Sequence, residues 1–202
     1  MPEAAVCEFG SLRIAYDEGV LRPRSWTQMQ SEWAAELSPG LADGPILELC
    51  AGAGQIGLLA AVMTGRGLVQ VDVDPHAATF ACENARAAGV ADHEFRVAPL
   101  QAALAPEERF SLILADPPYI PSGDVAGFPD DPVIAIDGGE DGLDVVRSCM
   151  AVARAHLAPG GVLLLQVRGE SQARSVDSAD LRVTETRAFD SERAIAKLQP
   201  LF

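Results

Sequence analysis

The tetrapeptide Asp116-Pro117-Pro118-Tyr119 carries residue types that can hold a planar –NH2 group for reaction. An amide or aromatic amine is a poor nucleophile because its lone pair is delocalised into the π system. The Asp116 side chain and the Pro117 carbonyl can accept hydrogen bonds from both N–H groups, which favours a more pyramidal nitrogen with its lone pair aimed at an electrophile. The prolines stiffen the loop, and Tyr119 offers a ring for stacking. Asp116, Pro117 and Tyr119 are therefore catalytic candidates, and a proline-terminated strand with a capping aspartate is the structural alternative.

A glycine-rich segment at residues 50–57 follows a short apolar run and precedes a helical pattern. Gly52, Gly54 and Gly57 satisfy G-x-G-x-x-G, and glycines there allow a tight turn and close approach of the backbone to a ligand. Asp72 ends the next strand-like segment, where a carboxylate can accept hydrogen bonds from ribose hydroxyls. This pattern is typical of dinucleotide-binding folds and of S-adenosylmethionine-binding folds alike.

Glu48 helps to separate these two ligands, because it lies near the end of the strand before the glycines. A carboxylate there attracts the positively charged methionine end of S-adenosylmethionine and repels a pyrophosphate. A partly exposed acid without a ligand is the alternative.

The segments that position these residues alternate between strand and helix patterns. Repeated β-α-β alternation predicts a mostly parallel sheet with helices on both faces, and the last two strands, with no long helix between them, predict a hairpin at one edge. Residues 117–142 are rich in Pro, Gly and Asp and indicate a long functional loop. The predicted strands are 45–50, 68–73, 93–97, 110–115, 162–167, 181–188 and 194–198, and the predicted helices are 55–64, 76–88 and 143–157.

Residues 1–40 do not share this alternation. Residues 11–17 alternate as in a small β element, and residues 26–37 have a helical pattern that ends before Pro39-Gly40. We interpret residues 1–40 as an N-terminal extension or lid, too short for a separate domain, and residues 41–202 as the main domain.

Composition limits the class of protein. The chain has 202 residues, 49% of them hydrophobic, which suffices for one domain with a substantial core. The net charge of −14 disfavours broad binding to nucleic acid. The four cysteines are scattered without metal-ligand spacing, and no apolar run reaches membrane-spanning length. These features predict a cytoplasmic protein with no metal site and no membrane partner.

The glycine loop and the Asp-Pro-Pro-Tyr motif together resemble a class I S-adenosylmethionine-dependent methyltransferase with the (N/D/S)-P-P-(Y/F/W) signature of amino-methylating members. Residues 116–144 are similar to the HemK/PrmC family of glutamine-N5 methyltransferases, which modify peptide chain release factors. Asp131-Pro132, Gly138-Gly139 and Asp141-Gly142-Leu143 match that family's acidic-Pro pair and GG-x-DGL segment, and residues 21–27 resemble its L-I-P-R-P-x-T segment. The resemblance covers about residues 9–170.

This resemblance implies a Rossmann-like α/β class I methyltransferase fold, with a mostly parallel seven-stranded sheet and a C-terminal antiparallel hairpin. It implies S-adenosylmethionine as the cofactor. The cofactor-binding candidates are Arg24, Thr27, Glu48, Ala51, Gly52, Gly54, Gln55, Ile56, Asp72, Val73, Pro99 and Leu100.

The chain departs from the family pattern at several positions. Asp116 replaces the usual asparagine, Cys50 replaces the first glycine of the loop, and Ala98-Pro99 replaces a frequent Gly-Asp pair. Trp26 stands where the family has glutamate, and the helical N-terminal domain of bacterial members is absent from these residues.

We therefore predict an S-adenosylmethionine-dependent N-methyltransferase acting on a planar amide or amino nitrogen, either a protein glutamine or a small-molecule amine. The alternative substrate is the exocyclic amino group of an RNA or DNA base. Alternatives of another class are a binding module for S-adenosylmethionine or a nucleotide without catalysis, and an NAD(P)-dependent oxidoreductase.

Overall fold

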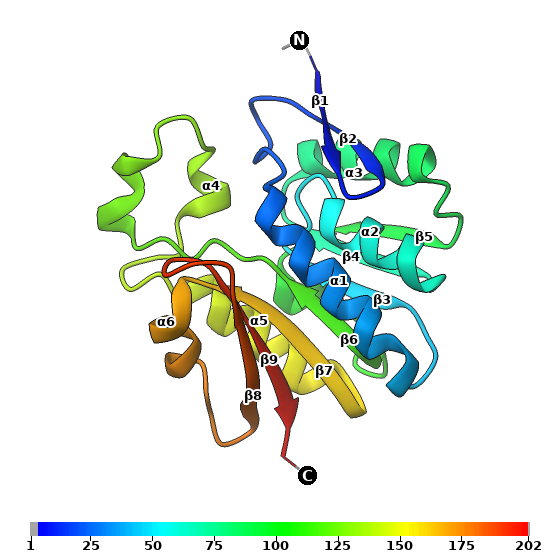
Figure 1. Cartoon of the computed structure of the whole chain (residues 1–202), viewed down its shortest axis with the longest axis vertical. Helices are drawn as coiled ribbons and strands as arrows, with labels where there is room; N and C mark the ends of the chain where they lie inside the picture. The colour runs from blue at the N-terminus through cyan, green and yellow to red at the C-terminus, as the bar shows by residue number, and fades with distance from the viewer. Residues whose placement is uncertain (1–3, 202) are drawn as a thin grey trace.

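The computed structural model describes residues 4–201, and its centre is a seven-stranded sheet (Figure 1). The strand order is β5-β4-β3-β6-β7-β9-β8, with β9 antiparallel to both of its neighbours and the other pairs parallel. This confirms the predicted α/β sheet with a hairpin at one edge. The strands are β3 (Ile46–Leu49), β4 (Leu68–Asp72), β5 (His93–Val97), β6 (Phe110–Ala115), β7 (Leu157–Val167), β8 (Leu181–Ala188) and β9 (Ala194–Pro200).

Helices cover both faces of the sheet, and each face has its own apolar core. One face is packed by α1 (Gln28–Leu37), α2 (Gln55–Thr64) and α3 (Pro75–Ala88). The other is packed by α5 (Asp144–His156) and α6 (Gly169–Ser175). Central strands are buried on both sides, which explains their mostly apolar sequences. None of the helices within residues 4–201 combines the length and apolarity needed to cross a membrane.

The start of α3 shows how local sequence fixes an element beside the cavity described below. Asp74 is the N-cap residue, and its side chain accepts a hydrogen bond from the His76 N–H at 2.8 Å. Pro75 occupies the first turn, where its missing N–H costs nothing. The polypeptide therefore turns from β4 into α3 within two residues of Asp72.

Three segments differ from the predicted elements. The strand predicted at 162–167 begins at Leu157, because residues on both sides of the Pro159-Gly160-Gly161 turn pair with β6 across an irregular register. The helix α6 was not predicted, since its seven residues are too few to show a clear period. The predicted loop 117–142 contains two short helices, η4 (Ser122–Gly127) and α4 (Val133–Ile136).

The N-terminal 40 residues contribute to the core. An antiparallel hairpin of β1 (Ala5–Phe9) and β2 (Leu12–Tyr16) precedes α1. Within α1, Trp33 is only 1% exposed, and Gln30 Nε2 donates to the carbonyl oxygens of Ala115 and Leu164 at 3.1 and 2.9 Å. Helix α1 is thus a layer of the fold, and the boundary at residue 40 stays a prediction.

Candidate functional site

A cavity of about 550 Å³ lies at the carboxyl ends of β3, β4 and β6. Parallel α/β sheets bind ligands at this edge because the loops after the strands converge there. The residues that line it include eight of the predicted site residues: Ala51, Gly52, Gln55, Ile56, Asp72, Val73, Leu100 and Asp116. The predicted functional loop also contributes Val133, Ile134, Ala135, Asp137, Gly138 and Gly139, and Gly19 and Val20 line the cavity without having been singled out from the sequence.

Asp72 organises the glycine loop. Its Oδ2 accepts a hydrogen bond from the Gly52 N–H at 2.8 Å, and its Oδ1 accepts one from the Asp74 N–H at 3.0 Å. Burial raises the pKa of Asp72 above its usual range, while these backbone donors act in the opposite direction. Gly52 has φ +53°, and a Cβ there would meet no atom within 4 Å, so its exposed backbone faces open cavity. The loop therefore presents its main chain to a ligand.

Cys50 begins the same loop with φ +57°, in the left-handed region that glycine tolerates best. It is the non-glycine residue with positive φ among residues 4–201, at the position where the resembled family has glycine. Its Sγ lies 3.9 Å from the Sγ of Cys149 on α5. This contact and burial both raise the pKa of the Cys50 thiol, so Cys50 stays protonated at neutral pH.

The cavity suits S-adenosylmethionine by the chemistry of its lining. Gln55 Oε1 is buried without a hydrogen-bond partner in the described chain, as expected of an acceptor reserved for a ligand N–H or O–H. Val73, which follows Asp72 and is 55% exposed, and Leu100 both line the cavity. Their apolar side chains offer a surface on which the flat adenine ring can pack. The Asp72 carboxylate retains acceptor capacity for ribose hydroxyls.

Glu48 does not line this cavity, which corrects the position expected for it. It is 3% exposed, its Oε1 accepts from the Gly57 N–H at 2.9 Å, and its Oε2 accepts from Gln70 Nε2. Burial raises the pKa of Glu48 to about 8. The side chain therefore joins β3 to α2 and β4, because a glycine at 57 leaves room for it.

Other predicted cofactor residues also lie outside the lining. Gly54 is the N-cap of α2 with φ +84°, and its carbonyl accepts from Gln70. Pro99 precedes the short helix η3 (Leu100–Ala102) and sets the position of Leu100. Thr27 Oγ1 donates to the Arg24 carbonyl at 2.9 Å, which stabilises the turn before α1. These three residues shape the site from outside.

Asp116 follows β6 and opens onto the cavity. Its carboxylate makes no hydrogen bond to any group within residues 4–201, and the Pro117 carbonyl likewise has no donor there. Burial raises the pKa of Asp116 to about 7. Two adjacent acceptors are thus available to a ligand that carries an –NH2 group.

Tyr119 does not line the cavity described above, which we call the donor side because it suits the methyl donor. It lies near Asp116, on the side of the β8–β9 connection. Burial raises the pKa of its hydroxyl, and the Asp116 charge adds to this, while Arg193 and Arg24 act in the opposite direction. Arg24 also pairs with Asp131, which joins the N-terminal segment to the long loop. Arg193 was not predicted, because the hairpin that brings it here is a tertiary feature.

Aromatic and guanidinium groups stack on this second side. The guanidinium carbon of Arg193 lies 4.0 Å from the Trp26 ring centroid and 5.3 Å from that of Phe189. The two rings are 6.4 Å apart, and Phe189 is 55% exposed. We call Trp26, Phe189 and Arg193 the stacked wall.

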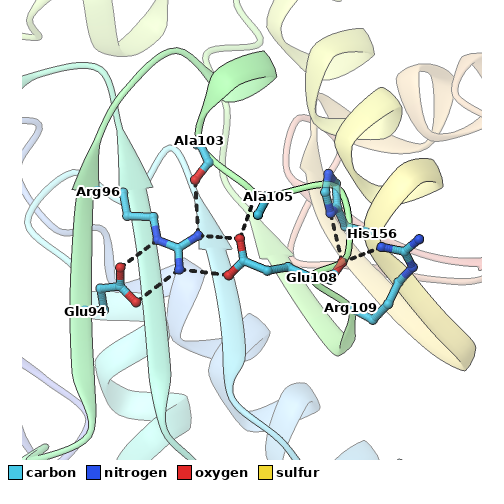
Figure 2. A network of polar contacts seen from close by, with 7 residues as sticks. All are labelled: Glu94, Arg96, Ala103, Ala105, Glu108, Arg109 and His156. Carbon is cyan, nitrogen blue, oxygen red and sulfur yellow. Dashed lines mark hydrogen bonds and ion pairs between the residues drawn. The ribbon is translucent and has the colours of Figure 1, made fainter.

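An ion-pair network holds the strand that leads into the donor side (Figure 2). Arg96 on β5 donates to both carboxylate oxygens of Glu94 and of Glu108, and to the Ala103 carbonyl at 3.1 Å. The Glu108 carbonyl accepts in turn from Arg109 and contacts His156 Nδ1 at 2.9 Å. This network fixes the segment after β5 that contains Leu100.

Comparison with known proteins shows which proteins the chain is similar to. Residues 32–127 match the methyltransferase small domain family. The chain is 36% identical over 165 residues to the release factor glutamine methyltransferase of Deinococcus radiodurans, covering 79% of this chain and 58% of that protein. It is 33% identical over 174 residues to the ribosomal protein uL3 glutamine methyltransferase of Burkholderia pseudomallei, covering 78% and 56%. The chain thus spans less than two thirds of the length of these relatives.

A solved structure shares the fold at low sequence identity. The tRNA (uracil-54, C5)-methyltransferase of Pyrococcus abyssi, in complex with S-adenosyl-L-homocysteine, superposes with a TM-score of 0.63 at 20% identity, covering 98% of this chain and 44% of that chain. The chain therefore has the fold of this methyltransferase, contains a segment that matches the methyltransferase small domain family, and is similar in sequence to the release factor glutamine methyltransferases.

Proposed function

We propose that the protein transfers a methyl group to the planar amide nitrogen of a protein glutamine. The observation that carries this proposal is the pair of free acceptors, the Asp116 carboxylate and the Pro117 carbonyl, at the end of β6. Asp116 lines a cavity that suits the methyl donor. A carboxamide has two N–H groups, which match these two acceptors.

Three kinds of contact hold the methyl donor in its cavity. S-adenosylmethionine, when bound, supplies an electrophilic methyl group on a positively charged sulfur. We assign ribose binding to Asp72, the Gln55 acceptor to a polar hydrogen of the donor, and the exposed Val73 side chain to the adenine ring. Gly52 allows the backbone to approach the donor closely.

On the acceptor side, Asp116 acts by orientation and electrostatics. As an ionised carboxylate it accepts a hydrogen bond from one acceptor N–H, while Pro117 accepts the other. As the methyl group passes from sulfur to nitrogen, the S–CH3 bond breaks, S-adenosylhomocysteine leaves and positive charge builds on the nitrogen. The Asp116 carboxylate stabilises that charge and takes up the N–H proton that the methylated amide loses. The raised pKa of Asp116, about 7, means that this form predominates only above neutral pH.

The acceptor class rests on the relatives and on charge. Two groups of relatives methylate glutamine in proteins of translation, as their names state. The net charge of −14 opposes a phosphate backbone at the rim, where Asp124, Asp130, Asp137 and Glu140 lie on the long loop. The scattered free cysteines fit our further proposal that the protein is cytoplasmic.

Radiolabelled S-adenosylmethionine tests the function. Purified release factor and ribosomal protein uL3 are each incubated with the protein, and a cell lysate split into protein and nucleic-acid fractions is treated in parallel. We expect label in a protein fraction, on a glutamine side chain by mass spectrometry. Label in RNA or DNA with none in protein would replace the proposal with base methylation.

A further inference from the structure

Four side-chain polar atoms within residues 4–201 are buried without a hydrogen-bond partner, and three of them belong to residues at the carboxyl edge of the sheet, Gln30, Gln55 and Gln166. One, Gln55 Oε1, lines the donor cavity. The other three are Gln166 Nε2, Gln30 Oε1 and Trp26 Nε1. Buried polar groups are normally paired, so a local group of unpaired ones calls for a ligand.

The sheet register places Gln166 beside Asp116. In the parallel pair of β6 and β7, Ala115 is opposite Leu165, so the next residues along the two strands are Asp116 and Gln166. Leu164 and Leu114 pack on the α1 side of the sheet, and Gln166 follows Leu164 by two residues, which puts its side chain on that same side. Gln166 is 2% exposed and is opposite Ile195 on β9.

The other two unpaired atoms, Gln30 Oε1 and Trp26 Nε1, belong to the segment at the start of α1. Gln30 bridges the carbonyls of Ala115 and Leu164, one residue before Asp116 and two before Gln166. Trp26 precedes Gln30 by about one helical turn. Its indole lies under Arg193, whose side chain is 32% exposed, and next to Arg24.

We infer that Gln166 is a specificity-determining residue that donates a hydrogen bond from Nε2 to the carbonyl oxygen of the acceptor carboxamide. This inference rests on the proposed function and adds the third contact of the carboxamide. Asp116 and Pro117 accept from its –NH2 group, and Gln166 supplies a donor for its oxygen. The Trp26 indole N–H is a second donor on the same side.

Access to Gln166 lies through the stacked wall. Arg193 and Arg24 are long, partly exposed side chains, paired with Asp190 and Asp131, that can move without disturbing the backbone. Binding of an acceptor displaces them from the Trp26 ring and exposes the recess. An alkyl amine has no oxygen for Gln166 and would leave this donor unpaired, which disfavours lysine-type acceptors.

The contact acts on binding more than on the chemical step. A donor to the amide oxygen withdraws electron density from the nitrogen, so it orients the acceptor without making the nitrogen more nucleophilic. Its loss is therefore expected to raise KM for the acceptor and to leave kcat nearly unchanged.

The test compares two variants. Gln166→Met keeps the side-chain length and removes the hydrogen-bond donor, and Gln199→Met is the control, at the end of β9 that is far from Ile195, the partner of Gln166. With release factor or uL3 as acceptor, we expect Gln166→Met to raise KM about tenfold. The affinity of Gln166→Met for S-adenosylhomocysteine is expected to stay the same. Its thermal midpoint is expected to stay the same or to rise, because the substitution removes an unpaired buried amide. Gln199→Met is expected to leave KM unchanged, and Trp26→Phe tests the second donor.

Two outcomes would overturn the inference while leaving the proposed function intact. One is an unchanged KM in Gln166→Met. The other is a lowered thermal midpoint with parallel loss of S-adenosylhomocysteine binding, which is the result of a structural role.

A separate readout applies if the wild-type protein labels neither purified protein and no protein of the lysate, a result that would refute the proposed function. The side-chain amide signal of Gln166 is then followed by 15N NMR while N-acetylglutamine amide is added to the S-adenosylhomocysteine complex. A shift that is absent in Asp116→Ala supports the carboxamide contact. No shift in the wild-type protein rejects it.

Discussion

Glu48 Oε1 accepts a hydrogen bond from the Gly57 N–H at 2.9 Å, and a Cβ at Gly57 would collide with that same carboxyl group. The strand before the glycine loop and the helix after it are thereby joined underneath the loop. The carboxyl group is out of contact with water and also bonded to Gln70. Its protonation state therefore affects folding more directly than ligand binding.

Glu48→Gln is expected to change how stability depends on pH. The pKa of Glu48 is about 8 in the folded protein and 4.5 ordinarily, so the folded state keeps a proton that the unfolded state loses. The stabilising contribution is complete below pH 4.5 and is lost as the pH rises to about 8, by at most roughly 4–5 kcal/mol. Denaturant titrations from pH 5 to 8 should show that the free energy of unfolding of Glu48→Gln increases relative to that of the wild type as the pH rises. Glu83→Gln, on the exposed side of α3, is the control and should show no such trend.

Asp116→Asn is expected to remove a pH dependence from methyl transfer. The wild-type kcat/KM should rise through pH 7, because the pKa of Asp116 is about 7 and the ionised form is the acceptor. Asparagine keeps an oxygen acceptor without titrating, so the variant should have a flatter profile. Asp116→Ala should abolish turnover while S-adenosylmethionine affinity stays nearly constant. A wild-type inflection that persists in Asp116→Asn would assign the titration to another group.

Asp72→Ala is expected to weaken binding of S-adenosylmethionine about tenfold or more, since hydrogen bonds to a charged group contribute roughly 1.5–3 kcal/mol. The Gly52 and Asp74 N–H groups also lose their acceptor, so the loop itself is loosened. Asp72→Asn keeps one acceptor oxygen, so its affinity for S-adenosylmethionine should lie between those of the wild type and Asp72→Ala. Calorimetry gives both affinities, and tighter binding of NAD than of S-adenosylmethionine to the wild type would contradict the site assignment.

Arg96→Ala is expected to lower the free energy of unfolding by about 1–2 kcal/mol, because two carboxylates and the Ala103 carbonyl lose a common donor (Figure 2). Arg154→Ala breaks a pair whose side chains are 63% and 60% exposed and should cost under about 0.5 kcal/mol. Urea denaturation of both variants makes the comparison. Equal losses would mean that the lower exposure of Arg96 and its second carboxylate partner contribute nothing to stability.

The main sheet and the donor loop could be predicted because their signals are local. Strand 110–115 is apolar except for Ser111, and the glycines after β3 stand at fixed spacing from Asp72. The side-chain direction of Glu48 could not be predicted, because the two sides of a doubly buried strand have similar sequence requirements.

The acceptor side of the site was less accessible to sequence reasoning. Phe189 and Arg193 lie 70 and 74 residues after Tyr119, and the β8–β9 hairpin brings them to this side of the site. Gln166 sits within an apolar run where a single amide carries no period. Its meaning depends on register with β6, which only the folded sheet defines.

The packing of α1 has a practical consequence for truncation. A chain cut to begin at residue 41 would lose Trp33 and uncover Leu164 and Ile195 on the central sheet. It would also strip the Ala115 and Leu164 carbonyls of the Gln30 amide. Such a fragment would expose a large apolar strip and tend to aggregate. The smallest autonomous folding unit is therefore longer than the family match at residues 32–127: it needs the whole of α1 at one end and the β8–β9 hairpin at the other.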